Sequence, residues 1–505
     1  MGLTKPKSTS FDITAGSLSS AQIKALGIET ASFADLAVTV DKANLTGVTY
    51  PGFEEDVALI GFKVAANGSL GKYNLIDQAV DAFEDASGID SGASTNATRD
   101  SSGKYYSGAT SAQEALTTVE SSTWTAPAAI ESTMHLLVVG GGGASSTRGN
   151  GNGGAGAGGL VYISNYAVTG GQAYTYTVGA GAPSVTSSPG NAAPAGDNSV
   201  FDGAGVHQTI TANGGGRGSG PGEHNGGAGG SGGGGSNMYN SHGQNGATNQ
   251  PTDFGSYTGV GFGFPGGAGS SKPNPGWNMS GAGGGGAGAV GQIQQGNNSG
   301  GAGGVGKDYS SVFGTGVGES GWFAGGGGGG GGPTPNAGGA GGNGGGGDGG
   351  TYNSGLNNGG GYPGTANTGG GGGGAGADKY PTGGGGSGVI VLKYNTLGDM
   401  TLVSNSTTAE AVPTKGDVVL TYTNNAGTAT LNTDLIASVS RDNGTTYTAV
   451  TLAGQGTTGG QTIASASGVD ISGQPSGTSM VWKVATNNQS GSKKTRINGV
   501  SLGWA

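Results

Sequence analysis

The sequence contains no cysteine, which excludes disulfide bonds and thiolate metal sites. It also contains no apolar run long enough to cross a bilayer. The basic start of the chain, residues 1–7, is followed by no apolar signal core. We therefore expect a soluble product that does not use an ordinary signal peptide. Its stability must come from packing, hydrogen bonds or oligomerisation.

Charge is scarce as well. Only 10% of the residues are charged, and 30 acidic against 20 basic residues give a net charge of −10. No basic stripe is visible, so we expect no binding of nucleic acid. Hydrophobic residues make up 32% of the chain, too few for one large conventional core. The low charge equally argues against an ordinary disordered tail, which charge usually keeps soluble.

What the chain has in abundance is glycine, which supplies 121 of its 505 residues. Glycine dominates residues 140–388, in runs that are repeatedly broken and restarted. Such a segment usually indicates a flexible linker. Collagen would need glycine at every third place and abundant proline, and consecutive glycines with 17 prolines exclude it. The purest runs are residues 140–143, 232–235, 283–286, 325–332, 344–347, 369–374 and 383–386.

Apolar strands bracket this glycine-rich region. Residues 134–139 are a buried-type strand that runs straight into Gly140, and residues 389–392 form a similar strand just after the last glycine run. A flexible linker has no reason to begin and end inside one sheet. The glycine-rich region is therefore predicted to be a folded insertion. Further strands are predicted at residues 160–163, 174–178 and 209–212.

Glycine runs lose much backbone entropy on ordering, so a single run would stay disordered. Many runs side by side can pack closely as extended three-fold helices, because no Cβ separates them and each N–H and C=O can bond to a neighbour. A run such as residues 325–332 would then be about 25 Å long. We predict a rigid bundle of the polyglycine II type, with the intervening loops at its ends.

Those loops carry most of the bulky side chains of the region. A rigid scaffold that presents aromatic loops is typical of recognition, because aromatic side chains give much contact area at low entropy cost. The alternative is that the same side chains cover the rod ends or pack the bundle edge. The candidate binding residues are Tyr239, Phe254, Tyr257, Trp277, Trp322, Tyr352, Tyr362 and Tyr380.

Residues 1–121 are predicted to form an N-terminal attachment or oligomerisation region with helices. A helical hairpin or short bundle is indicated by apolar residues at three- and four-residue spacing, either closed by neighbouring subunits or packed within the chain. Asn74 would cap the second helix, Gly88 would end it, and residues 88–122 would form a loop or spacer. The two stripes are Val57, Ile60 and Val64, and then Ile76, Val80 and Phe83.

Residues 397–505 are predicted to form a β-sandwich, after a central domain of residues 122–396. Asn443-Gly444 is a strong hairpin turn. Residues 440–447 resemble an Asp box, which is a structural turn and not a catalytic motif. Strands are predicted at residues 417–423, 434–441, 447–452, 459–464, 480–485 and 494–504.

No catalytic or metal-binding set emerges. Residues 301–308 nearly match a phosphate-binding loop, but Asp308 replaces the required Ser or Thr. The four histidines show no metal-ligand spacing, and His135, in a predicted strand, is expected to be packed or hydrogen-bonded. The acidic pair Glu54-Glu55 fits a helix N-terminus. We expect no enzymatic activity, no cofactor and no metal.

Four stretches carry a resemblance to a known family: residues 124–127, 136–143, 158–161 and 211–216. They look like the glycine-rich domain of bacteriophage tail-fibre proteins. Residues 62–89 also resemble segments of marine phage fibres. In similar distal adhesins of T-even-like phages, glycine-rich motifs form a polyglycine II sandwich and the loops between them contact the host receptor.

The resemblance implies a tail-fibre or receptor-binding protein that recognises a bacterial surface glycan or outer-membrane protein non-covalently. It further implies anchoring to other virion tail proteins through the N-terminal region, a homotrimer, and assembly in the host cytoplasm into a virion. The first alternative is a structural appendage, such as a capsid fibre or spacer, without receptor binding. Two weaker alternatives are an enzyme that cleaves surface glycans and an ice-binding protein, which would need a flat regular face.

Overall fold

The computed structural model describes ten stretches of the chain, all within one compact unit that spans residues 73–505. The predicted first helix, with Val57, Ile60 and Val64, lies outside the described residues. The described stretches are residues 78–147, 151–186, 192–219, 225–238, 241–269, 279–294, 299–332, 336–352, 359–377 and 380–505.

The two strands that bracket the glycine-rich region pair with each other. Val139 is the antiparallel partner of Val389, and the pairing continues to Leu136 and Leu392. The prediction that the region begins and ends inside one sheet is therefore confirmed. That sheet has the order β13 (Gly261–Phe262), β7 (Leu160–Ala167), β6 (Ile130–Val139), β16 (Val389–Leu397) and β4 (Ala109–Leu116).

Both faces of this sheet are covered, which explains why its central strands are continuously apolar over residues 136–139 and 389–392. On one face, Leu136 and Val138 pack with Tyr166 and Tyr174. On the other, Leu137 and its neighbours pack under the short helix α3 (Ser310–Phe313). A second sheet lies against the first core, in the order β10 (Ile210–Ala212), β9 (Ser199–Phe201), β8 (Ala173–Thr177) and β5 (Ser121–Thr125).

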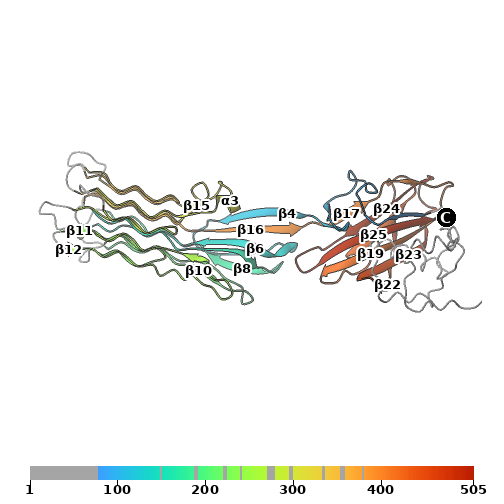
Figure 1. Cartoon of the computed structure of the whole chain (residues 1–505), viewed down its shortest axis with the longest axis horizontal. Helices are drawn as coiled ribbons and strands as arrows, with labels where there is room; N and C mark the ends of the chain where they lie inside the picture. The colour runs from blue at the N-terminus through green and yellow to red at the C-terminus, as the bar shows by residue number, and fades with distance from the viewer. Residues whose placement is uncertain are drawn as a thin grey trace, which may run out of the picture. The chain divides into compact units, whose positions relative to one another are not determined.

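Two short hairpin pairs belong to the glycine-rich region. Figure 1 shows the first pair at the end of the bundle away from β6 and β16, and β15 of the second at the end where the bundle meets these strands. The pairs are β11 (Asn237–Met238) with β12 (Ser241–His242), and β14 (Lys307–Asp308) with β15 (Trp322–Phe323).

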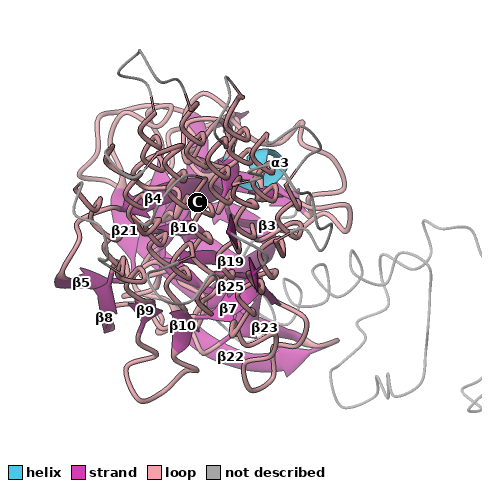
Figure 2. Cartoon of the chain, turned by 90° about the vertical axis from the view of Figure 1, so that its left-hand side faces the viewer, coloured by secondary structure: helices cyan, strands magenta, loops and turns pink. Residues whose placement is uncertain are grey.

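Between the bracketing strands, extended glycine-rich segments run side by side (Figure 1), and Figure 2 looks along them. We call each segment a rod. The rod of residues 325–332, here the central rod, donates its N–H groups with a period of three residues. Gly325, Gly328 and Gly331 donate to the carbonyls of Gly344, Gly347 and Gly350 in one neighbouring rod. Gly326 and Gly329 donate to Gly304 and Gly301 in a second rod, and Gly327 and Gly330 donate to Ala155 and Asn152 in a third. All these distances are 2.8–3.0 Å.

The carbonyl groups of the central rod repeat the pattern with three other rods. Gly325 and Gly328 accept from Gly371 and Gly374, Gly326 and Gly329 from Gly342 and Gly339, and Gly327 and Gly330 from Gly284 and Gly281. A period of three residues per turn is that of the polyglycine II helix. Six different rods therefore surround the central rod, and every hydrogen bond of its backbone holds a neighbour.

The rods lie too close for side chains between them. A Cβ placed on Gly329 would be 2.1 Å from the carbonyl oxygen of Gly281, and one on Gly326 would be 2.2 Å from that of Gly284. Real Cβ atoms do not approach backbone oxygen to such distances. Glycine is required at these positions by the close approach of backbones, which the hydrogen bonds between rods demand.

The C-terminal part is a β-sandwich, but N-terminal strands complete it. Its core includes Leu420 and Val500 from one sheet and Val439 and Trp482 from the other. The first sheet has the order β2 (Ala97–Arg99), β3 (Tyr105–Ser107), β25 (Lys494–Trp504), β19 (Lys415–Ala426), β23 (Gln461–Asp470) and β22 (Ala453–Thr458), with β1 (Gln78–Asp81) also on β25. The second has β17 (Met400–Val403), β24 (Ser479–Thr486), β20 (Leu435–Ser440) and β21 (Thr448–Val450), with β18 (Thr407–Thr408) on β24.

The predicted second helix, from Asn74 to Gly88, is wrong in its described part. Val80 lies in β1, opposite Ser501 of β25. Phe83 has a φ of +59°, which no α-helix allows, and its N–H bonds to the Asp81 carboxylate at 2.8 Å. The helical spacing of these apolar residues arises instead from a strand followed by a tight turn.

The predicted loop of residues 88–122 is also wrong, because β2, β3 and β4 lie within it. Tyr105 and Tyr106 form part of β3, and Tyr105 packs edge-on against Phe83 in the sandwich core, with ring centroids 5.0 Å apart. Serine and threonine are common here because much of β4 is exposed on one face. The sheet pairing thus joins residues 78–107 to the C-terminal sandwich.

Hydrogen exchange will test the rods. The amides of residues 325–331 should exchange at least about a thousandfold more slowly than random-coil amides, because exposing them requires separation of neighbouring rods, at a free energy of about 5 kcal/mol or more. Exchange followed by mass spectrometry on peptides from this segment gives the rates. Random-coil rates would mean that the segment is a linker.

A single methyl group should disrupt the bundle. We expect Gly329→Ala to lower the free energy of unfolding by about 2 kcal/mol or more, because its Cβ has nowhere to go between the rods. The matched control is Gly316→Ala, on an exposed turn where a Cβ meets nothing within 4 Å; it should change stability by less than about 0.5 kcal/mol. Thermal unfolding midpoints compare the two variants, and equal midpoints would contradict the close approach.

Candidate functional site

The glycine bundle has two different ends. At the sheet end, rods continue directly into strands, as Gly140 follows β6 and Ala324 follows β15. At the opposite end, here called the loop end, the rods reach residues such as Asn152 and Gly330, whose backbones bond to each other at 2.8 Å. Figure 1 shows the strands β11 and β12 there. The candidate binding residues divide between the two ends and the side of the bundle.

Phe254 and Tyr257 lie at the sheet end and serve packing. Phe254 is buried in the core beside β7. Tyr257 stacks on Tyr166, with ring centroids 6.0 Å apart, and its hydroxyl oxygen accepts a hydrogen bond from the N–H of Ala167 at 3.1 Å. These contacts favour the alternative that both side chains support the scaffold.

Trp322 also lies at the sheet end. It is half-buried in β15, opposite Asp308, and its backbone exchanges hydrogen bonds with Glu319 at 2.9 and 3.0 Å. The Glu319 carboxylate in turn accepts from the N–H of Gly345 at 2.8 Å. These hydrogen bonds connect the first residues of two rods to each other. Trp322 therefore has a structural role.

Tyr352 and Tyr380 are brought together at the loop end. Tyr380 lies flat on Gly359, where a Cβ would be 2.2 Å from the ring. A Cβ on Gly376 would lie 2.8 Å from the backbone nitrogen of Tyr352, and the N–H of Gly376 donates to the carbonyl of Gly359 at 2.8 Å. Both tyrosines are half-buried, so each keeps an accessible part.

Tyr362 lies on the side of the bundle. Its N–H bonds to the carbonyl of Asp348 at 2.9 Å, in the middle of the neighbouring rod. With 56% of its surface exposed, it is the most accessible of the described candidates. Tyr239 and Trp277, the two remaining candidates, lie outside the described residues.

Buried hydroxyl groups close the rods at the loop end, and the sequence analysis missed them. Ser145 donates to the carbonyl of Gly153 at 2.7 Å, and Thr382 donates to the carbonyl of Ser145 at 2.6 Å. Ser146 donates to the carbonyl of Gly218 at 3.1 Å. Their signal in the sequence is the position of Ser and Thr beside a glycine run, shortly after residues 140–143 or directly before residues 383–386.

Two titratable side chains near the sheet end, His135 and Tyr394, form hydrogen bonds that stabilise the fold. Burial and then Lys393 lower the pKa of His135, whose Nδ1 lies 2.9 Å from the Tyr162 hydroxyl. His135 is thus hydrogen-bonded, as the sequence predicted. Burial, together with the hydrogen bond that it donates to Glu114, raises the pKa of Tyr394 to about 12.

Across the described stretches, no group of three or more histidine, aspartate or glutamate residues is placed to hold a metal ion. The same stretches contain no helix with the length and apolar character needed to span a membrane.

The Asp-box-like turn of the sandwich is structural. One carboxylate oxygen of Asp442 accepts from the Ser440 hydroxyl at 2.7 Å and from the N–H of Thr446 at 2.8 Å. The buried Arg441 guanidinium donates to backbone carbonyls, including those of Pro413 at 2.7 Å and Ser472 at 2.8 Å. Both charged groups hold loops in place, so this turn offers no site.

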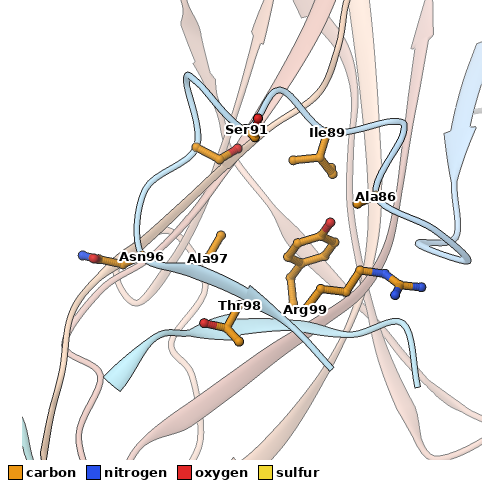
Figure 3. A pocket seen from close by; sticks show the side chains of 9 residues that line it. Ala86, Ile89, Ser91, Asn96, Ala97, Thr98 and Arg99 are labelled. Atoms are coloured by element: carbon orange, nitrogen blue, oxygen red, sulfur yellow. The ribbon is translucent and has the colours of Figure 1, made fainter. Parts of the chain in front are cut away.

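The sandwich also has a hollow of about 380 Å³ beside β2 and β3 (Figure 3). Ile89 and Ala97 line it, with Ser91 and Asn96 at its polar side. Its one cationic side chain, Arg99, donates to the backbone carbonyl of Phe83 through Nε at 3.0 Å and through Nη2 at 2.6 Å. Arg99 therefore stabilises a turn, and the hollow presents no acid–base pair.

Comparison with protein families agrees with the architecture. The model of the glycine-rich domain family matches residues 117–395, which is more than half of the 505 residues. The chain therefore belongs to the glycine-rich domain family. None of the curated proteins matches it.

Proposed function

We propose that this chain is a tail-fibre or receptor-binding protein of a bacteriophage and that its glycine bundle carries the surface that contacts the host. The observation that carries the proposal is the hydrogen-bond network of the rods, which turns a glycine-rich segment into a rigid support for the loop end. Tyr380 and Tyr352 pack there beside Gly359 and Gly376, two residues whose backbones bond to each other. The resemblance to phage fibres supplies the class of partner, a bacterial surface glycan or outer-membrane protein.

A rigid support suits weak, reversible recognition. The ring of Tyr380 and the backbone of Tyr352 are held against the rods before a ligand binds, so less conformational entropy remains to be lost. Their exposed parts offer an apolar face and a hydroxyl group each. We propose that many copies of the fibre act together, so that weak single contacts give firm attachment. Virion anchoring and trimer formation are proposed to reside in the N-terminal region.

A structural appendage is the second candidate. The observation in its favour is that Phe254, Tyr257 and Trp322 all serve packing at the sheet end, which gives three of the eight candidates a structural role. Such an appendage would need rigid rods and no ligand. The two functions differ in whether the loop end determines attachment to cells.

Competition for adsorption separates these candidates. Purified chain should reduce the adsorption of virions to host cells. The double variant Tyr352→Ala/Tyr380→Ala should need at least about 30-fold higher concentration, since two tyrosines that contact a receptor contribute about 2 kcal/mol or more. The matched control is Tyr362→Ala, an exposed tyrosine on the side of the bundle, which should compete as well as the unmodified chain.

Three outcomes count against receptor binding at the loop end. Absence of competition by the unmodified chain supports the structural appendage. Equal competition by the double variant and the unmodified chain places the contact elsewhere. Release of reducing ends from host polysaccharide by the chain would instead indicate a glycan-cleaving enzyme. Thermal unfolding of each variant shows that the bundle is intact.

A further inference from the structure

The hollow of the sandwich lies between its two sheets. One wall is β2, the edge strand of the first sheet. The other wall is the loop of residues 82–96, which is bound to β17 of the second sheet. There the N–H of Asp90 donates to the carbonyl of Val403 at 2.9 Å, and an isolated bridge joins Thr95 to Thr401. A space of about 380 Å³ remains between the two walls.

Hydrogen bonds fix the loop wall in place. The Ser94 hydroxyl oxygen accepts from the N–H of Val403 at 3.0 Å. The Asn96 side chain donates to the carbonyl of Asp399 at 3.1 Å. Two polar side chains of the lining thus bind other parts of the sandwich, and the shape of the hollow exists before a ligand enters.

Tyr105 supplies a polar group that has no such partner. It lines the hollow and is only 5% exposed, yet its hydroxyl group forms no hydrogen bond with any residue that the structure describes. A hydroxyl group on a side chain this buried normally has a partner, because burial without one costs free energy. Burial also raises the pKa of the Tyr105 phenol, so the hydroxyl group keeps its proton and can donate.

Apolar side chains form much of the remaining lining. Ile89 from the loop and Ala97 from β2 both point into the space between the walls (Figure 3), and Ala86 lies beside them. Ile89 is 9% exposed. Ser91, an exposed residue of the same loop, adds a second hydroxyl group at the outer side. The hollow therefore combines an apolar interior with one buried hydrogen-bond donor.

The charges of the lining favour an uncharged ligand. None of the nine described residues that line the hollow is acidic, so a cation would find no carboxylate there. The forked edge of the Arg99 guanidinium already donates to the carbonyls of Phe83 and Glu84, which leaves it closed to a bidentate carboxylate. The net charge of −10 on the chain further disfavours an anion.

We infer that this hollow binds the acetamido group of an N-acetylated sugar. The methyl of that group packs against Ile89 and Ala97, and its carbonyl oxygen accepts a hydrogen bond from the Tyr105 hydroxyl. A purely aliphatic ligand would leave this hydroxyl unpaired. A sugar that carries hydroxyl groups alone would bury them against alkyl side chains without partners.

The volume of the hollow agrees with a small ligand. About 380 Å³ lies near the lower end of the roughly 300–1,000 Å³ found for small-molecule sites, which suits a single sugar ring. The hollow is a different site from the loop end of the glycine bundle. Binding of a sugar here therefore does not depend on the proposed contact with a host at that end.

Saturation-transfer NMR on the full chain tests this inference, with N-acetylglucosamine and N-acetylgalactosamine as probes. At least one of them should receive saturation, most strongly at the acetyl methyl protons, because this group enters the hollow. Glucose, which has a similar ring without the acetamido group, should bind at least about fivefold more weakly.

Two variants place the sugar in the hollow. Tyr105→Phe removes only the hydroxyl group and should raise the dissociation constant of the sugar about fivefold or more. Its unfolding midpoint should not fall, since this hydroxyl group bonds to no described residue. Ala97→Leu should fill the interior and abolish the methyl signal. The matched control is Tyr106→Phe, the same change on the opposite face of β3, where the ring lies 5.0 Å from the Arg496 guanidinium; it should bind like the unmodified chain.

Several results would overturn the inference. They are the absence of saturation in both N-acetylated sugars, equal binding of glucose, and unchanged affinity in Tyr105→Phe or Ala97→Leu. Equal losses in Tyr105→Phe and Tyr106→Phe would place the sugar outside the hollow. Acetamido groups also occur on acetylated amines, so the amide of Nε-acetyl-lysine is measured beside the sugars. If it binds as tightly as they do, the assignment to a sugar is wrong.

Discussion

The hydrogen bond between neighbouring rods is the interaction on which the rest of the structure depends. It forms only when two backbones come so close that no Cβ fits between them, as at Gly326 and Gly329. One rod gains little, since ordering glycine costs more entropy than ordering any other residue. Surrounding a rod with others gives its N–H and C=O groups partners on all sides, so the rods are stable only when many of them pack together.

This constraint also decides where side chains can appear. A rod surrounded on all sides accepts almost nothing larger than glycine, whereas an outer rod has one free position in each turn. The bulky residues of the region therefore gather at the two ends and on outward positions. Any contact with a partner on such a scaffold therefore depends on side chains at its ends and on its outer rods, while its interior supplies rigidity.

Much of this architecture could be predicted from the sequence where local signals agree with the fold. The apolar strands around Val139 and Val389 and the turn at Asn443-Gly444 are of this kind, as is the packing of glycine runs. The helical prediction around Val80 was wrong because the strand partner, Ser501, lies some 400 residues away and leaves no local signal. Phe254 was wrongly expected at a binding surface, because its burial in the core depends on tertiary contacts that leave no local signal in the sequence.

The pairing of β1 with β25 has a consequence for how the protein is made. Gln78 meets Gly503, and β25 lies between β19 on one side and β1 and β3 on the other. During translation, the early strands must wait until residues 494–504 leave the ribosome before their sheet can form. The glycine bundle, which needs neither end, can order first and hold the separated halves of the sandwich near each other. Folding of the sandwich is therefore a late step, with a rate set by long-range pairing.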